Sequence, residues 1–196
     1  MAINSNLSSF LDKVKQGVRP NMFEVEFAFP SGIDAGDGTL ATYMCKSAAL
    51  PASNVGVIEV PFRGRTVKIA GDRTFDNWST TFITDRDMKI RAQFEKWLEL
   101  INSHEPNTAQ LANPSETDGY TRGIIIRQKD KDASAAGTEL RSYKLWYAFP
   151  TSVSAVDLAY DSNDQIEEFS VEFQYSYWTV GSNDGTVSGP SGISIS

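Results

Sequence analysis

The stretch Val67-Lys68-Ile69-Ala70-Gly71-Asp72-Arg73-Thr74-Phe75-Asp76-Asn77-Trp78 joins two segments of alternating apolar residues through a single glycine. Gly71 can take a positive φ or a close backbone approach that a β-branched residue could not adopt. Asp72 can accept hydrogen bonds from the local backbone, as aspartates in turns do. The stretch therefore predicts a change of chain direction at Gly71.

The segment before this stretch, residues 51–71, alternates like a strand but contains too many prolines and glycines for a central one. The interrupting residues are Pro51, Gly56, Pro61, Gly64 and Gly71. A long apolar excursion of this kind either folds back on its own domain or is buried in a neighbouring molecule. The pattern leaves both alternatives open.

Six other segments show the period of two that is typical of strands. The clearest is 169–177, where Phe169, Val171 and Phe173 alternate with polar residues. The expected strands are 23–29, 40–48, 74–84, 122–129, 140–148 and 169–177.

Two segments have the period of a helix instead. Residues 5–16 carry apolar side chains at i, i+3, i+4 and i+7, which predicts a short N-terminal helix. Residues 85–103 carry a longer apolar stripe, and Thr84 with Asp87 resembles a capping box at its start. This second segment is expected to pack on a sheet as the main helix.

These elements predict one domain over residues 1–178, of the β-rich α+β class. Its expected form is a six-stranded antiparallel β-sandwich or partly closed barrel with one main flanking helix and a short N-terminal helix. The length of 196 residues suits one domain with a sizeable core. Residues 179–196 are rich in Gly and Ser, which predicts a flexible extension.

The chain is acidic, with a formal net charge of −7 and an isoelectric point of about 4.7. A DNA-binding surface normally needs clustered Lys and Arg, so this charge argues against one. Cys45 is the only cysteine, so no internal disulfide can form. No segment has the length of a membrane span or the pattern of a signal peptide, so we expect no membrane anchor.

The sequence shows no motif of a familiar catalytic class. A Walker loop, a GxSxG elbow and a GxGxxG fingerprint are missing. The single His104 follows the main helix, where an imidazole can meet unpaired carbonyl groups, and one His with Cys45 is too few for a zinc site. Asp72 and Asp76 form a weak candidate carboxylate pair for glycoside hydrolysis, with Arg73 between them. We expect no enzyme, cofactor or metal site.

Several sequence blocks resemble the tail tube proteins of T4-like contractile-tailed bacteriophages. Residues 70–78 are similar to the family's "AGDRTFDDW" and differ only at Asn77. The residues of this block that carry the family motif are Gly71, Asp72, Arg73, Thr74, Phe75 and Trp78. Further blocks occur in the same order: 19–26 resembles "RPNLFQVE", 45–52 resembles "CKATALPA", 160–166 resembles "DSNNEI", and 177–178 resembles the closing "YW".

This resemblance implies a structural subunit of the inner tail tube, located in the tail of a virion and made in the host cytoplasm. Subunits of the family are expected to join their inner sheets into hexameric rings, which stack into a tube inside the sheath and conduct DNA without binding it specifically. The expected partners are further copies of the chain, the tail sheath protein, the tape-measure protein and the baseplate tube initiator.

The resemblance also suggests roles for particular residues. It favours burial of segment 51–71 in the adjacent ring, so the expected stacking residues are Val57, Ile58, Val60 and Phe62. Glutamates on the polar faces of strands are candidates for an acidic lumen that DNA would not adhere to, although they would equally suit an ordinary solvent-facing surface. These candidates are Glu24, Glu26, Glu168 and Glu172.

Two other functions fit parts of the sequence. One is the tube subunit of a phage-derived injection particle or of a type VI-like secretion apparatus, which would carry protein. The other is a carbohydrate-active enzyme or binding module built on a β-sandwich, which would act as a monomer and form no polymer.

Overall fold

The computed structural model describes residues 7–14, 18–33, 38–130, 139–160 and 165–181, and these ranges contain three helices and nine strands. The helices are α1 (Leu7–Val14), α2 (Thr39–Met44) and α3 (Lys89–Ile101). The strands are β1 (Phe23–Phe27), β2 (Cys45–Ala48), β3 (Asn54–Phe62), β4 (Arg65–Thr74), β5 (Trp78–Ile83), β6 (Arg122–Lys129), β7 (Glu139–Val153), β8 (Glu168–Gln174) and β9 (Tyr177–Val180).

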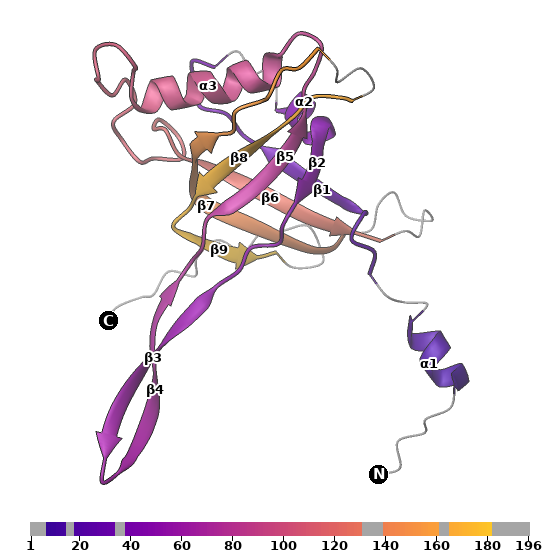
Figure 1. The fold of residues 1–196 in the computed structure, drawn as a ribbon, viewed down its shortest axis with the longest axis vertical. Coiled ribbons are helices and arrows are strands. Elements are labelled where there is room, and N and C mark those ends of the chain that lie inside the picture. Colours follow the sequence, from indigo (N-terminus) through magenta and orange to yellow (C-terminus); the bar gives the residue numbers. More distant parts are fainter. Residues whose placement is uncertain (1–6, 15–17, 34–37, 131–138, 161–164, 182–196) are drawn as a thin grey trace.

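Seven strands form an antiparallel sheet that folds over on itself into two layers. The strand order is β1-β6-β7-β8-β5-β2, with β9 also paired to β7. The long strand β7 belongs to both layers, because its first part pairs with β6 and β9 and its last part pairs with β8. Tyr147 lies where the pairing changes and has a positive φ of 56°. Layer one is therefore β1-β6-β7-β9, and layer two is β7-β8-β5-β2 (Figure 1).

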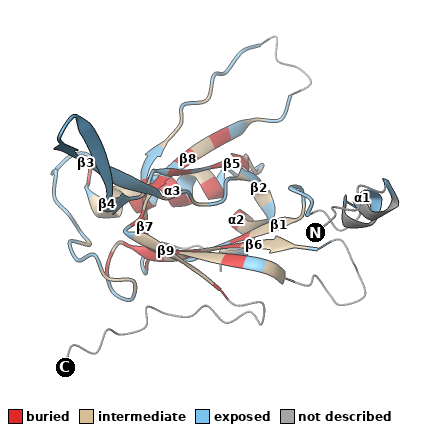
Figure 2. Ribbon diagram, turned by 90° about the horizontal axis from the view of Figure 1, so that it is seen from below, coloured by how far each residue is buried: buried red, intermediate tan, exposed pale blue. Residues whose placement is uncertain are grey.

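The hydrophobic core lies between these layers, as Figure 2 shows. Phe27 of β1 faces layer two, with its ring centroid 5.3 Å from Phe82 and 6.2 Å from Phe173. Helix α3 lies across one end of the sandwich and buries Phe94 and Trp97 there (Figure 1). Aromatic side chains with large apolar areas therefore hold the layers together.

The sheet does not close into a barrel. Strands β1 and β2 form its two ends and are not paired with each other, and α2 packs against β1 and β5. The prediction of a β-rich α+β fold with antiparallel strands is thus confirmed, and of its two forms the structure is the open sandwich. A further difference is that the described chain has nine strands, where six were expected.

Several boundaries differ from the sequence prediction, among them the start of the expected strand 74–84, which is Trp78 in β5, and the end of the expected strand 140–148, which is Val153 in β7. The expected strand 40–48 begins as helix α2, because Ala41 is fully buried and Thr42 bonds back to the Gly38 carbonyl through its N–H (3.1 Å) and its hydroxyl (3.2 Å). The expected strand 169–177 is interrupted after Gln174, and the chain then enters layer one as β9. The main helix begins at Lys89, later than the expected residue 85.

Strands β3 and β4 form a separate two-stranded sheet, which we call the ribbon. Figure 1 shows the ribbon projecting from the body at the end opposite to α3. All its residues are exposed except Gly71, which is partly buried. The segment 51–71 therefore does not fold back on its own domain.

Candidate assembly surfaces

The ribbon gathers most of its apolar side chains on one face. Its register pairs Ile58 with Ile69, Val60 with Val67, and Phe62 with Arg65. Paired residues in an antiparallel sheet point to the same side, and alternate residues share a face. The resulting apolar stripe consists of Ile58, Val60, Phe62, Val67 and Ile69, each of which is 43 to 62 % exposed.

The opposite face of the ribbon is more polar. It carries Glu59 and Lys68, whose side chains form an ion pair of 3.5 Å. Val57 pairs with Ala70 on this face. Of the four stacking residues predicted from the sequence, Val57 is therefore separated from the other three. The sequence prediction also missed Val67 and Ile69, which the hairpin register brings next to Val60 and Ile58.

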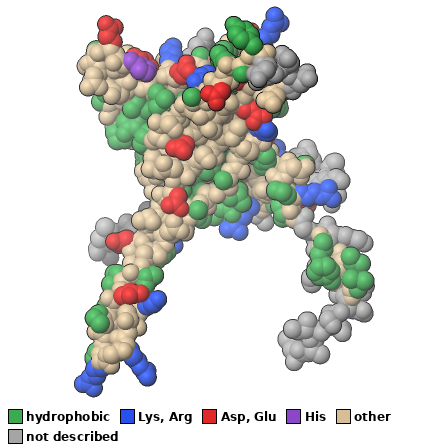
Figure 3. Space-filling view, viewed as in Figure 1, with side chains coloured by type: hydrophobic (Ala, Val, Ile, Leu, Met, Phe, Trp, Pro, Cys, Tyr) green, Lys and Arg blue, Asp and Glu red, His purple; other side chains and the backbone are tan. Residues whose placement is uncertain are grey.

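The tip of the ribbon is a two-residue turn between Phe62 and Arg65. Arg63 and Gly64 both have positive φ, of 45° and 79°, as tight hairpin turns require. The Arg63 guanidinium lies 5.3 Å from the centre of the Phe62 ring. The tip therefore presents two arginines beside an aromatic ring, and Figure 3 shows them as a basic end.

Near its base, the ribbon has an irregular register between Val55 and Val57. Gly71 approaches the opposite strand closely here: a Cβ on it would lie 3.2 Å from the Gly56 carbonyl oxygen and 3.3 Å from the Ile58 side chain. Strand β4 continues through Gly71 to Thr74. The predicted change of direction at Gly71 is therefore wrong, and this glycine serves a close approach of two strands.

The rest of the family block connects the ribbon to the body. Asp72, Arg73 and Thr74 are exposed at the end of β4. Phe75 then packs on the core, with its ring 5.8 Å from Tyr175. Trp78 is buried and donates its indole N–H to the Ala49 carbonyl at 2.6 Å.

The two aspartates of this block show no catalytic arrangement. Asp76 accepts a hydrogen bond of 2.8 Å from the Asn54 side chain, across the base of the ribbon. Asp72 is exposed on β4. Burial, with a smaller effect of the Asp76 charge, raises the pKa of the nearby Tyr175 phenol. That phenol donates to the Ala52 carbonyl at 3.3 Å, so the group is part of the packing under the ribbon.

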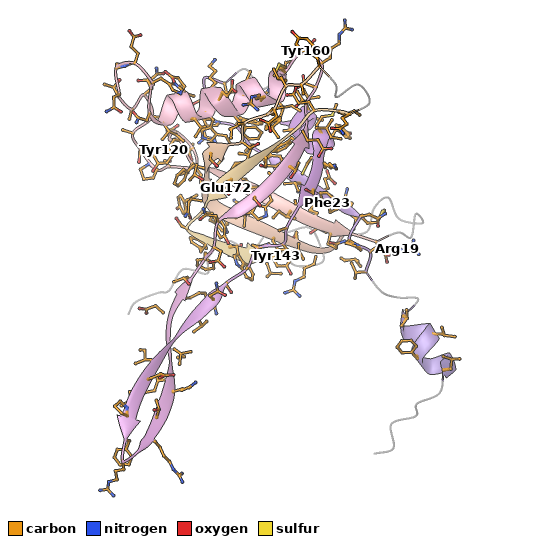
Figure 4. The ribbon with its side chains drawn as sticks, in the orientation of Figure 1. Arg19, Phe23, Tyr120, Tyr143, Tyr160 and Glu172 are labelled. Atoms are coloured by element: carbon orange, nitrogen blue, oxygen red, sulfur yellow. The ribbon has the colours of Figure 1, made fainter. Side chains whose placement is uncertain are left out.

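The four candidate lumen glutamates lie on two opposite outer surfaces. Glu24 and Glu26 are on the outer face of layer one, because Val25 and Phe27 between them point into the core. Glu168 and Glu172 are on the outer face of layer two, because Phe169 and Val171 between them point into the core. Figure 4 labels Glu172 on this layer. A single channel can therefore be lined by only one of these pairs.

Basic residues accompany these glutamates. On layer one, Glu24 pairs with Lys129, and Glu26 pairs with Arg127 at 2.6 Å. On layer two, Glu168 contacts Lys46 at 2.5 Å. The Glu172 carboxylate accepts a hydrogen bond from the Ser152 hydroxyl at 3.5 Å, and no Lys or Arg of the described residues pairs with it.

Arg122 is a buried charged residue that the sequence prediction missed. Its guanidinium donates to the carbonyl oxygens of Phe29, Ser115, Thr117, Gly119 and Thr121. Burial lowers its pKa, and the charges of Glu116 and Asp118 partly offset this effect. The side chain thus fixes the loop before β6. Its isolated position in a strand of aliphatic residues was the available sequence signal.

The remaining titratable candidates have structural partners. His104 follows α3 and pairs with Glu99 of the helix, so its ring contacts a carboxylate. Cys45 lies 3.2 Å from the Thr80 hydroxyl, and burial raises the pKa of its thiol. Among the residues that the structure describes, no group of three His, Cys, Asp or Glu side chains could hold a metal ion. No helix in those same ranges is long and apolar enough to span a membrane.

Comparison with known proteins agrees with the family resemblance. A family model described as phage tail tube protein matches residues 18–181. The tail tube protein gp19 of Enterobacteria phage T4 is 36 % identical over 160 residues, which cover 82 % of this chain and 90 % of that protein. The tail tube protein of Serratia phage KSP90 is 27 % identical over 158 residues, covering 80 % and 85 %.

Solved structures share the fold at lower identity. The extended sheath–tube complex of an extracellular contractile injection system matches with a TM-score of 0.59 at 14 % identity, covering 91 % of this chain and 99 % of that chain. The tube-terminating cap of the anti-feeding prophage gives 0.58 at 18 % identity, covering 93 % and 99 %. With the match of the family model and the identity to the phage T4 protein, these findings lead to one conclusion: the chain belongs to the phage tail tube protein family.

Proposed function

We propose that this protein is the subunit of the inner tube of a contractile phage tail. Hexameric rings of the chain stack into a tube inside the sheath, and DNA passes through the bore when the sheath contracts. The observation that carries this proposal is the 36 % identity to a phage tail tube protein over 82 % of the chain. The exposed ribbon, which has no role in the core of the subunit, supports it.

We assign ring closure to the edges of layer one. Within the described ranges, strand β1 pairs only with β6 and β9 only with β7, so each offers its second edge to an adjacent subunit. The end strand of layer two, β2, has four residues and an irregular register, which is typical of a protected edge. In the ring, β1 of one subunit adds to β9 of the next by β-augmentation.

This assignment also selects the lumen glutamates. If layer one forms the wall of the bore, Glu24 and Glu26 face the channel, and Glu168 with Glu172 face outward. The neighbouring Arg127 and Lys129 balance the two lumen carboxylates, which gives a polar wall of nearly even charge. Such a wall offers no basic cluster that would hold DNA.

Stacking is the role we assign to the apolar stripe. An isolated two-stranded hairpin has little stability in water. Burial of the ribbon against another ring would therefore stabilise its folded conformation. Removing apolar surface from water stabilises contacts by about 25 cal/mol per Å². The tail sheath protein, the tape-measure protein and the baseplate tube initiator are the further partners of this assembly.

The related fold in an extracellular contractile injection system leaves a protein-conducting tube as the alternative. The higher identity to the phage proteins favours DNA as the cargo. In either assembly the role is structural, and we propose no catalytic activity.

The test compares assembly with folding. Wild-type protein should form rings or tubes in negative-stain micrographs. Phe62→Ala should reduce the amount of sedimenting tube severely, because the loss is on the order of 2 kcal/mol per contact and recurs around each ring junction. Its monomer should melt at the wild-type temperature, since Phe62 lies outside the core. Thr66→Ala, on the other face of the ribbon, is the matched control and should assemble normally.

Two results would contradict the proposal. A wild-type protein that remains monomeric at all concentrations would exclude a tube subunit. A Phe62→Ala variant that unfolds like Trp97→Ala, which removes a fully buried core side chain, would place the ribbon in the core of the subunit.

A further inference from the structure

A second exposed apolar surface lies at the end of the body opposite to the ribbon. Residues Ala155–Tyr160 and Gln165–Glu168, which we call the rim, surround a hollow of about 1010 Å³. Leu158 is 87 % exposed and Ile166 is 70 % exposed, while Tyr160 is fully exposed. Figure 4 shows Tyr160 beyond the start of α3, far from the ribbon. These side chains contribute nothing to the core.

The rim is acidic. Its described residues include the carboxylates Asp157, Glu167 and Glu168 and neither Lys nor Arg, and of these three carboxylates Glu168 is paired with Lys46. The ribbon tip has the opposite charge, with Arg63 and Arg65 on either side of Gly64. Both surfaces also expose an aromatic side chain, Phe62 on the ribbon and Tyr160 on the rim.

The positions of the two surfaces suit a stack. Rings that all point the same way repeat a head-to-tail contact, so the surface at one end must fit the surface at the other. The ribbon projects from one end of the body and the rim lies at the other, as Figure 1 shows. The ribbon of one ring therefore points toward the rim of the ring below it.

We infer that the rim is the receptor for the ribbon tip of a second copy of this chain in the adjacent ring. This inference rests on the proposed function. In the contact, Arg63 and Arg65 approach the rim carboxylates, and Phe62 packs with Leu158, Tyr160 and Ile166. Electrostatic complementarity fixes the register of such a contact and rejects wrong pairings, while the apolar residues supply burial.

Cross-linking tests this contact directly. The variant carries Arg63→Cys and Leu158→Cys on a Cys45→Ser background and is assembled into tubes, which micrographs verify. A short bis-maleimide then joins thiols that are close together. Since each copy carries one donor and one acceptor cysteine, the expected product is a ladder of linked chains on a denaturing gel. The control replaces Leu158→Cys by Ser79→Cys, an exposed site on the outer face of layer two, and should give no ladder.

Charge exchange gives an independent readout that needs no cysteine. Arg63→Glu with Arg65→Glu should lower the yield of sedimenting tubes at least tenfold at low salt. Adding Asp157→Lys with Glu167→Lys, which leaves the pair of Glu168 with Lys46 intact, should restore much of that yield.

The outcomes separate the two proposals. Verified tubes that give no ladder, or a charge reversal that has no effect on assembly, would overturn the rim as the receptor while leaving the tube function intact. Wild-type protein that forms no tube would overturn both.

Discussion

At the scale of single residues, the position that decides the shape of the ribbon is Gly71. Its backbone lies so close to Gly56 that a side chain would meet a carbonyl group, which cannot move aside as a flexible side chain could. Of the two glycines it is Gly71 that makes this approach tight, since a Cβ on Gly56 would meet the Asp72 carbonyl oxygen at an ordinary contact distance of 3.4 Å. We expect the alignment of the apolar stripe with the body to depend on this contact.

Gly71→Val should therefore impair stacking and leave the body folded. Overpacking of this kind costs about 1–3 kcal/mol, and the cost falls within the ribbon. The expected result is a monomer melting temperature close to wild type with a strong loss of sedimenting tubes. Ala70→Val adds the same type of side chain at an exposed neighbouring position and is the control. Equal effects of the two variants would argue against a special role of the close approach.

Cys45 provides a prediction about pH. Burial raises the pKa of its thiol, and the Thr80 hydroxyl offsets this only in part. The folded protein thus holds the proton more tightly than the unfolded chain. The resulting stability is present below the ordinary thiol pKa and is lost as the pH rises through the raised value.

The rate of alkylation by iodoacetamide, measured against pH, checks this. Cys45 should react slowly at pH 8, and its rate should rise only above the pH at which an unfolded control peptide has already reached half its maximum. An exposed cysteine, made by Ser47→Cys on a Cys45→Ser background, should follow the peptide. A Cys45 profile that coincides with the peptide would contradict the prediction.

Residues of the family block could be recognised from sequence, but their physical roles could not. A glycine can allow the chain to turn, or it can allow a neighbouring strand to approach closely. The sequence pattern cannot distinguish these two roles, because both depend on the absence of a Cβ. Arg122 was missed for a related reason. Its partners are carbonyl groups of a loop, and no sequence pattern encodes carbonyl positions.

At the scale of elements, the start of α3 shows how a capping pattern can point to the wrong side chain. The sequence suggested Thr84 with Asp87. In the structure, the carboxylate of Asp85 accepts the N–H groups of Lys89 and Ile90, at 3.1 and 3.2 Å. Met88 precedes the helix with a positive φ of 53°, and this turn brings Asp85 over the helix end.

Asp85→Ala should therefore lower the free energy of unfolding by about 1 kcal/mol, as the loss of helix caps commonly does. Asp87→Ala should change it much less, because the ion pair that Asp87 forms with Lys89 is exposed to solvent. Chemical denaturation of both variants measures the difference. If Asp87→Ala were the more damaging change, the capping pattern of the sequence would be the better description.

Strands could be predicted from the sequence where one face is buried and the other is exposed to solvent. The alternation located β5, β6 and β8 well, because a one-residue error would turn their apolar residues outward. It failed at α2, a helix of six residues that tertiary packing on β1 stabilises. The predicted strand 169–177 also spans the break between β8 and β9. The apolar alternation continues across this break, although the chain passes from layer two to layer one there.

At the scale of the whole molecule, the structure bears on where the folded unit ends. The sequence prediction placed this end at Trp178. Strand β9 continues to Val180, where Thr179 accepts a hydrogen bond of 2.8 Å from the Trp146 indole, and the Gly181 N–H donates to Ser142 at 2.9 Å. The ordered pairing of the described chain thus extends beyond Trp178 to Gly181.

We expect a chain that ends at Gly181 to fold and form tubes like the full-length protein. A chain that ends at Trp178 should melt at a lower temperature, because it loses half of β9 and part of an edge assigned to ring closure. Thermal melts and sedimentation of both truncated proteins check this. Failure of the longer truncation to assemble, while remaining folded, would give residues 182–196 a role in the tube.

The projection of the ribbon from one end of the body also gives any polymer of this chain a direction. A growing stack has two chemically different termini. At one terminus the apolar ribbons of the last ring are exposed to solvent, and at the other terminus no ribbon is exposed. New subunits then add at the two termini with different rate constants, although the critical concentration is the same at both because either addition lengthens the same stack by one unit. Elongation from a template is consequently faster at one terminus, and a capping protein can recognise that terminus by its hairpins alone.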